Sequence, residues 1–450
     1  MKQLIIILFI LLSCLSVDAK DLFVATDGSD AVTYANNDID NPWLTVAHAW
    51  ANALDNDTVY YRQGSYPVNT EIDVASGGHN VTHTSYTGEQ ATWTSTLDDH
   101  VINIGEPDTT IDNIDVEWTP SADPGDSGFF ILGWASNISS PPRFTVQYCN
   151  FTIGGSSPSG NFAAIHARLN GGERADDAII QFNTFDGPGT EVGSANTTAI
   201  ITFQARNWTI KNNEIHDYYN GLYYNKHPDT VAGSDGLVEN NYIYDCHAAM
   251  YTQANSTTYR NNIIDGTVRM GFNGGDATDG NVGSDYNVFD HNTITGGIII
   301  ADQTDGGDNE YPGAQFNTWE DNILASQLNF YASNHNTSMN YNLYKTGDIV
   351  QQVSSYYNLS EWQTENSSDA NSLSNTPDYV GGVNPTTIAG FALDTGSPGI
   401  NAASDGTDMG ADVTLVGVDA SPASPTGNTQ LGSGTPVDIS DPTAPSVVLF

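Results

Sequence analysis

An asparagine followed within one or two positions by an apolar residue recurs in the middle of this chain, and its spacing constrains the fold more than any other feature. The marker asparagines are Asn150, Asn183, Asn213, Asn241, Asn262, Asn292, Asn322 and Asn342, so successive markers are 20 to 33 residues apart. Self-similarity at about 20 to 50 residues is typical of stacked units that cannot bury their apolar faces alone. Ile, Tyr, Phe, Val and Thr surround the markers and favour strands. We therefore predict a β-solenoid with one turn per repeat.

The residues that precede the markers form a second column, and this column suggests how the turns are held in register. Its members are Asn212, Asn240, Asn261, His291 and Asp321. Side chains stacked at the strand spacing of about 4.8 Å can hydrogen-bond to their equivalents above and below. We expect this column to form the ladder.

A second short strand follows several of the markers. These segments begin at Gly221, Ala249, Arg269 and Gly297. Aligned on their first residues, they place Tyr223, Tyr251, Gly271 and Ile299 in one column and Asn225, Gln253, Asn273 and Ala301 in another. Apolar and polar residues alternate in them, as half-buried strands require.

These repeats and both ends of the chain resemble the right-handed parallel β-helix superfamily, the pectate-lyase-like fold of pectate lyases, alginate lyases and related secreted proteins. At the beginning the similar segments are residues 21–30, 42–47 and 57–66. Towards the end they are residues 341–344, 362–363, 390–393, 397–402 and 408–411. The resemblance implies an all-β protein, a single-stranded right-handed parallel β-helix over residues 20–415.

A helix is predicted near the beginning of this domain. Asn41 can cap a helix whose first residue is Pro42. Trp43, Val46, Ala47, Trp50, Ala51 and Leu54 then form a continuous apolar stripe. We interpret residues 42–54 as a plug over the open end of the solenoid, where bare strand edges would invite aggregation. The alternative is an ordinary surface helix.

The two ends of the chain have different compositions from the middle. Residues 1–19 resemble a signal peptide, with Lys2, an apolar run over residues 4–12 and a small-residue site ending at Ala19. The run is too short to span a membrane. We therefore expect a secreted, extracellular or periplasmic protein; the alternative is an outer-membrane lipoprotein acylated at Cys14. Residues 416–450 are predicted to be a flexible tail or the start of a truncated module.

The charge balance limits the partners of this protein. Lys and Arg number 12 against 54 Asp and Glu, a formal net charge of −42. This excludes nucleic acid as an obvious partner and argues against an anionic membrane surface. It also suits a surface kept soluble in high salt, where self-repulsion is screened. We expect a monomer.

The two cysteines of the expected mature chain are predicted to be free, buried thiols. Cys149 and Cys246 lie three repeats apart. Three coils separate them by roughly 14 Å along the axis, beyond the reach of about 7 Å between the Cα atoms of a disulfide.

The resemblance implies a chemistry of β-elimination, in which Lys or Arg removes the proton beside a uronate carboxylate while Ca²⁺ or another cation neutralises that carboxylate. The candidate catalytic residues are Lys226, Arg269 and His227, and the candidate substrate-binding residues are Tyr223, Tyr224, Tyr251, Asn225, Gln253 and Asn273. Tyrosine rings can stack on sugars. The alternatives are a solvated turn lysine, an arginine in a salt bridge and an exposed imidazole.

Acidic loops indicate a Ca²⁺ site. Asp276 and Asp279 lie in one connection, and Asp302 and Asp305 lie in the equivalent connection of the next repeat, with glycines between them. Hard oxygen ligands on such loops suit Ca²⁺. The alternative is an acidic, solvated rim.

We therefore expect a polysaccharide-active protein, a Ca²⁺-assisted lyase of an acidic, uronate-containing polysaccharide. A non-catalytic carbohydrate-binding or adhesive surface protein is the first alternative. A glycoside hydrolase is the second, because Asp98, Asp99 and His100, or Asp176 and Asp177, can supply the two carboxylates such an enzyme needs.

Overall fold

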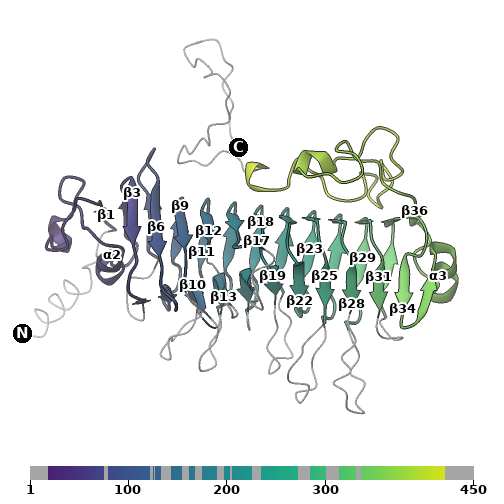
Figure 1. The fold of residues 1–450 in the computed structure, drawn as a ribbon, viewed down its shortest axis with the longest axis horizontal. Helices are drawn as coiled ribbons and strands as arrows, with labels where there is room; N and C mark the ends of the chain where they lie inside the picture. The colour runs from purple at the N-terminus through teal and green to yellow at the C-terminus, as the bar shows by residue number, and fades with distance from the viewer. Residues whose placement is uncertain are drawn as a thin grey trace, which may run out of the picture.

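The computed structural model describes residues 19–74, 80–121, 125, 127–132, 143–154, 162–167, 175–189, 197–202, 205–224, 235–271, 284–300, 314–330 and 336–420. In these residues the strands form three 12-stranded sheets that run side by side along the molecule (Figure 1). Each coil passes through sheet 1, then sheet 3, then sheet 2, before the chain enters the next coil.

Sheet 1 consists of β1 (Asp21–Val24), β2 (Thr58–Tyr61), β5 (Thr82–Ser85), β8 (Thr110–Asp112), β11 (Thr145–Gln147), β14 (Ile179–Gln181), β17 (Thr209–Lys211), β20 (Leu237–Glu239), β23 (Thr258–Arg260), β26 (Val288–Asp290), β29 (Thr318–Glu320) and β32 (Ser338–Asn340). Sheet 2 consists of β4 (Ile72–Val74), β7 (Ile102–Ile104), β10 (Ser127–Leu132), β13 (Phe162–Ala167), β16 (Thr198–Thr202), β19 (Asn220–Tyr224), β22 (Ala248–Thr252), β25 (Val268–Met270), β28 (Ile298–Ile300), β31 (Leu328–Phe330), β34 (Val350–Gln352) and β35 (Ser355–Tyr357). Sheet 3 consists of β3 (Gly64–Pro67), β6 (Ala91–Ser95), β9 (Ile114–Trp118), β12 (Asn150–Ile153), β15 (Thr184–Asp186), β18 (Glu214–His216), β21 (Tyr242–Tyr244), β24 (Ile263–Ile264), β27 (Thr293–Ile294), β30 (Ile323–Leu324), β33 (Leu343–Tyr344) and β36 (Leu373–Ser374). The helices are α2 (Val46–Asn52) and α3 (Leu359–Asn366), and short 3₁₀ turns are η1 (Tyr34–Asn36), η3 (Ile388–Phe391) and η4 (Val418–Ala420).

The fold is a single-stranded right-handed parallel β-helix, as the sequence predicts. Each strand pairs in parallel with its equivalent one coil away, for example β19 with β22, and the antiparallel pair among the described strands is β34 with β35. Side chains that point inward stack from coil to coil. Tyr259, Phe289 and Trp319 form one such stack, with ring centroids 4.6 and 3.8 Å apart. The core is therefore a continuous column that no single coil could build alone.

The asparagine ladder exists, but the prediction of its column is wrong. It occupies the marker column and not the column before it. The side-chain oxygen of Asn241 accepts hydrogen bonds from the backbone N–H and the side-chain amide of Asn213, both at 3.0 Å. The same pattern links each ladder residue to the next; its members are Asn183, Asn213, Asn241, Asn262, Asn292, Asn322 and Asn342. All are fully buried. Cys149, and not Asn150, holds the corresponding position in the preceding coil, because its backbone N–H donates to the Asn183 side chain.

The column that precedes the ladder has a conformational role. Asn212, Asn240, Asn261, His291 and Asp321 have φ between 51° and 60°, in the left-handed region. They turn the chain between sheet 1 and sheet 3. Asn and Asp tolerate this region better than most residues, which explains why the column is rich in amides and carboxylates. One side-chain bond does link two of its members, from the Asn261 amide to the Asn240 oxygen at 2.8 Å.

The capping helix is shorter than predicted. Helix α2 covers Val46–Asn52, and its N-cap is Thr45, whose side chain accepts a hydrogen bond from the His48 backbone N–H. Trp43, predicted to be helical, is extended and bridges to Val24 of β1. The helix lies at the N-terminal end of the stack (Figure 1), and Trp50 stacks on the buried His83 ring at 4.0 Å.

After β36 the chain turns back along the solenoid, which the sequence did not lead us to expect. Residues 375–420, the C-terminal strap, lie along one side of the C-terminal half of the molecule (Figure 1). The strap bonds to successive turn residues: Gly410 N–H donates to the Asp321 carbonyl, Asp412 N–H to the Asn261 side chain and Gly417 N–H to the Asn240 carbonyl. Its apolar side chains, such as Phe391 and Met409, pack on the outer face of sheet 3.

Three smaller expectations have mixed outcomes. Cys149 and Cys246 are both free, as predicted, but Cys246 is only partly buried. The described domain continues beyond residue 415, because η4 ends at Ala420. The predicted signal peptide, apart from Ala19, and residues 421–450 lie outside the described part of the chain. Within that part, no helix is long and apolar enough to cross a membrane.

Candidate functional site

Three side chains of sheet 2 lie in one outward row on adjacent coils. Tyr223 of β19 pairs with Tyr251 of β22, which pairs with Arg269 of β25. Their strand neighbours Leu222, Met250 and Val268 are fully buried in the core. Because successive side chains on a strand point to opposite faces, the two tyrosines and the arginine point outward.

The two tyrosines form a small aromatic surface. Their ring centroids lie 4.6 Å apart with an interplanar angle of 57°. Burial raises the pKa of Tyr223 to about 12. Burial raises the pKa of Tyr251 further, while the nearby Gln253 and the positive charge of Arg269 act in the opposite direction. Both phenols are therefore neutral at physiological pH and can donate hydrogen bonds as well as stack on a ring.

Arg269 is closer to the tyrosines than the sequence alignment indicated. That alignment put Gly271 opposite Tyr251, whereas the structure puts Arg269 there. The strand register is thus two residues away from the predicted one. The Nε atom of Arg269 is buried, and among the described residues this side chain has neither a hydrogen-bond partner for Nε nor an ion pair. The alternative considered for Arg269, a salt bridge to a neighbouring carboxylate, is therefore not seen in the described part of the chain.

Two other predicted binding residues have different positions. Tyr224 is fully buried and points into the core, so its predicted role in stacking on a sugar is wrong. The reason is the strand alternation, which sends Tyr223 and Tyr224 to opposite faces. Gln253 is only 5 % exposed and hydrogen-bonds the Tyr251 side chain, which places it to orient that ring.

The remaining predicted site residues lie outside the described residues. They are Lys226, His227, Asn225, Asn273, Asp276, Asp279, Asp302 and Asp305. Their roles in proton transfer, substrate binding and Ca²⁺ binding stay predictions. Asp285, which follows the first acidic loop, is described, and its carboxylate accepts a hydrogen bond from the Gln315 backbone N–H at 2.7 Å.

The carboxylates considered for a hydrolase bind neighbouring loops. Asp98 accepts bonds from the backbone N–H and the hydroxyl of Ser121. Asp176 accepts from the Arg206 backbone N–H, and Asp177 accepts from the Asn207 side chain, both at 3.0 Å. These contacts give the carboxylates a structural role in joining adjacent coils.

Two groups with metal-ligating side chains occur elsewhere among the described residues. One is Asp186, His216 and Asp217, and the other is Asp290, His291 and Asp321. Neither was predicted, because their members come together only through the register of the coils. Both groups contain a histidine, whereas Ca²⁺ prefers six to eight oxygen ligands.

The second group is already occupied by hydrogen bonds within the protein. Asp321 accepts from the Ser404 N–H and hydroxyl, each at 2.6 Å. His291 Nδ1 bonds to Asp290 at 2.7 Å, and its Nε2 bonds to Thr407 at 3.2 Å. These residues therefore attach the C-terminal strap to the solenoid, and their bonds to the protein leave them poorly suited to a Ca²⁺ site.

Comparisons with known proteins give a likeness of fold at low sequence identity. No protein-family model matches the chain, and no curated protein matches it. An alginate lyase solved in complex with G6 is 14% identical, with a TM-score of 0.49, over 92% of this chain and 97% of that one. A PL6 family polysaccharide lyase from Pseudopedobacter saltans is 10% identical, with a TM-score of 0.46, over 83% and 97%. A rhamnogalacturonan lyase is 11% identical, with a TM-score of 0.43, over 89% and 100%. Sequence identities and TM-scores this low do not show that the functional site of those proteins is present here. The site is therefore inferred from the geometry of this chain.

Proposed function

We propose that this protein is an exported lyase that binds an acidic, uronate-containing polysaccharide along the outer face of sheet 2 and cleaves it by β-elimination. The observation that carries the proposal is the register of Tyr223, Tyr251 and Arg269 on consecutive coils. The coil spacing of about 4.8 Å places an aromatic surface directly beside a cation. A sugar ring can stack on the first while its carboxylate pairs with the second.

Arg269 has the chemistry that the elimination requires. Removal of the proton beside a uronate carboxylate builds negative charge on that carboxylate, and a fixed guanidinium stabilises such charge. Tyr251 keeps its proton at neutral pH because burial raises its pKa. As the C–C double bond forms and the C–O bond to the glycosidic oxygen breaks, Tyr251 can donate its proton to that leaving oxygen and recover one from water. We assign the proton-abstracting role to Lys226, with His227 as the alternative.

Ca²⁺ would supply further neutralisation of the carboxylate if Asp276, Asp279, Asp302 and Asp305 hold it. This part of the proposal rests on the sequence alone. The charge of the protein is a second reason to expect a bound cation, because a chain with a formal net charge of −42 repels an anionic polymer unless cations lie between them.

Digestion of a panel of marine and plant polysaccharides, with and without Ca²⁺, tests the proposal. A lyase produces unsaturated uronate ends, which are measured by their ultraviolet absorbance. We expect Arg269→Ala to lower kcat/KM by about 100-fold or more, because a charge-stabilising donor is lost. Arg260→Ala is the matched control: Arg260 lies on sheet 1 and pairs with Glu239, away from the row.

Other outcomes would replace the proposal. New reducing ends without unsaturated products would show a glycoside hydrolase. Retention of the polymer without any cleavage would show a carbohydrate-binding or adhesive protein. Full activity of Arg269→Ala would show that the active site does not lie on sheet 2.

A further inference from the structure

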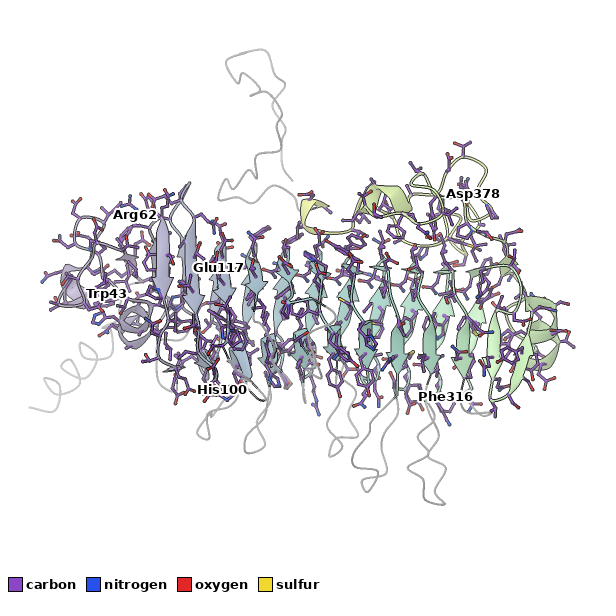
Figure 2. All side chains as sticks on the ribbon, in the orientation of Figure 1. Trp43, Arg62, His100, Glu117, Phe316 and Asp378 are labelled. Carbon is purple, nitrogen blue, oxygen red and sulfur yellow. The ribbon has the colours of Figure 1, made fainter. Side chains whose placement is uncertain are left out.

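Two aromatic side chains lie at the edge where each coil leaves sheet 2 and enters sheet 1. Tyr286 is two residues before β26 and Phe316 is two residues before β29, so they hold equivalent positions on adjacent coils. Their rings are nearly parallel, with centroids 5.1 Å apart and an interplanar angle of 7°. Tyr286 is 59 % exposed and Phe316 is 46 % exposed. Figure 2 shows Phe316 at the lower edge of the solenoid, on the side away from the C-terminal strap.

The backbone at these two positions disfavours aromatic residues. Tyr286 and Phe316 have φ of 58° and 57°, in the left-handed region, which a bulky side chain rarely adopts. The equivalent residues of other coils with a positive φ are all small and polar: Asn56, Asn80, Asp108, Asp177, Asn207, Asp235, Ser256 and Asn336. Asn and Asp tolerate this conformation better than other residues do. The turn therefore does not explain the two rings, and residues held in such a conformation cluster at binding sites.

Packing within the protein leaves the rings half uncovered. Each ring covers one face of the other, whereas an aromatic residue of the core is covered on both faces. The next residues in the same column are Ser256 on one side and Asn336 on the other, and both are short and exposed. Single exposed apolar residues are ordinary on a protein surface, but that does not account for two stacked rings on a strained turn.

The size and charge of this surface exclude several partners. A stable protein interface needs about 800 Å² from each partner, whereas two half-exposed rings offer roughly 200 Å². Nucleobases also stack on aromatic rings, but a chain with a formal net charge of −42 repels the phosphates of a nucleic acid and of an anionic membrane. An anionic sugar would lack a cation here, because no described lysine or arginine lies over either ring and Asp285 directly precedes Tyr286.

A neutral sugar ring fits the surface that remains. One face of a pyranose presents C–H groups, which stack on the negative face of an aromatic ring, and its edge carries hydroxyls. The two rings stack along the solenoid at about the coil spacing of 4.8 Å, so their outer faces point to Ser256 and to Asn336. A sugar on either outer face therefore lies beside a hydroxyl or an amide that can bond to its own hydroxyls.

We propose that Tyr286 and Phe316 form a saccharide-binding platform, which holds neutral pyranose units of a polysaccharide. The platform lies at the edge between sheets 2 and 1, apart from the row of Tyr223, Tyr251 and Arg269 on the outer face of sheet 2. It does not depend on the proposed cleavage. Its role is to hold the protein on neutral polymers, or on neutral segments of its substrate.

Affinity electrophoresis of the full chain in gels that contain a neutral xylan, mannan, glucan or galactan tests the platform. We expect at least one of these polymers to retard the wild type. The double variant Tyr286→Asn/Phe316→Asn should bind that polymer about 10-fold or more weakly, because both stacking contacts are lost. It should keep the melting temperature of the wild type, since asparagine relieves the left-handed turn and offsets the lost contact between the rings.

Phe182→Asn is the matched control. Phe182 also has a positive φ, 56°, and stacks on Tyr148 of the adjacent coil at 5.1 Å. This pair lies at the corner between sheets 1 and 3, where both rings are half-buried. Other coils have asparagine at the same position, such as Asn212. Phe182→Asn should bind the neutral polymer as the wild type does.

The inference is overturned if no neutral polysaccharide retards the wild type or if the double variant is retarded equally. Retardation by a uronate polymer alone would overturn the assignment to neutral sugars. Self-association that is lost in the double variant, with no polymer bound, would assign the rings to a contact between two copies of the chain. Arg269→Ala separates the two proposals: it should impair cleavage and leave retardation by neutral polysaccharides unchanged.

Discussion

Asparagine performs two different tasks at adjacent positions of each turn. The first residue, such as Asn240, adopts the left-handed conformation that bends the chain from sheet 1 to sheet 3. The second, such as Asn241, is fully buried and bonds to the coils on both sides. The bend directs the second side chain inward, where its amide satisfies backbone carbonyls that the corner leaves without partners.

Loss of one ladder amide should destabilise the whole solenoid. The Asn241 side chain donates to the Ile210 and Glu239 carbonyls and accepts from Asn213. Asn241→Ala leaves several buried groups unsatisfied, each costing about 1 to 3 kcal/mol, so we expect a loss of at least about 3 kcal/mol in the free energy of unfolding. Urea unfolding followed by circular dichroism measures this loss.

Asn150→Ala is the matched control for the ladder. Asn150 belongs to the same sequence repeat, but it is exposed, and among the described residues its side chain donates only to Asp115. Its substitution should cost less than about 1 kcal/mol. Equal losses for the two variants would contradict the assignment of the ladder to the column of Asn241.

The sequence contained the signal that separates these two columns. In the column before the ladder, Phe182 and Tyr341 interrupt the amides, whereas from Asn183 to Asn342 the marker column has an asparagine in every coil. Only the unbroken column can hydrogen-bond continuously. Composition alone favoured neither column, because a left-handed turn and an amide ladder both select asparagine.

At the scale of elements, strand lengths limited what the sequence could predict. The strands of sheet 2 vary from three residues in β25 to six in β13. An alignment on first residues therefore misplaced β25 by two positions and hid the contact between Tyr251 and Arg269. A shift by two keeps each side chain on the same face, so this error does not move Arg269 to the other face of the sheet.

The path of the C-terminal strap was not predicted, for a different physical reason. It has little regular secondary structure, and it is held by bonds to turn residues more than 80 positions earlier, such as Ser404 to Asp321. Neither periodicity nor propensity indicates such contacts. The terminal segment was recognised as part of the domain, but its path back along sheet 3 was not.

His291 should make the attachment of the strap depend on pH. Its hydrogen bond to Asp290, together with the charges of Asp290, Asp321 and Asp405, raises the pKa of His291 above the ordinary value of about 6.5. A raised folded-state pKa means that the added stability is fully present below about pH 6.5 and is lost as the pH rises through the folded value. Glu320 also faces this group from the adjacent coil.

Hydrogen exchange of residues 399–415 measures this attachment. We expect greater protection at pH 6 than at pH 9 in the wild type and no such difference in His291→Gln, which keeps a hydrogen-bonding side chain and cannot carry the charge. His247→Gln is the control, because His247 is exposed, stacks on Tyr219 and bonds to no carboxylate of the described residues. The same pH dependence in His291→Gln would assign the effect to other groups.

At the scale of the whole molecule, the fold was predictable because one pattern repeats. Each coil offers the same small strands and the same turn, so a register error in one repeat does not change the architecture. A functional site is changed by such an error, because it depends on which side chains the adjacent coils bring together. The sequence placed Tyr223, Tyr224 and Tyr251 together as binding residues, whereas the structure sends Tyr224 into the core and brings Tyr251 opposite Arg269.

The charge of the whole chain leads to a prediction about salt. With 54 acidic residues against 12 Lys and Arg, the folded molecule concentrates negative charge, and of the lysines and arginines in the described part only Arg62, Arg143 and Arg260 form ion pairs with carboxylates. Compaction therefore works against self-repulsion. Added salt shortens the Debye length from about 30 Å at 0.01 M to about 8 Å at 0.15 M, and the melting temperature should rise over this range by roughly 5 °C.

Sodium chloride and sodium perchlorate at equal, low ionic strength should give the same rise in melting temperature, because screening depends on ion charge. A rise with chloride alone would indicate solute exclusion, and a fall with both would show that ion pairs outweigh repulsion in this fold.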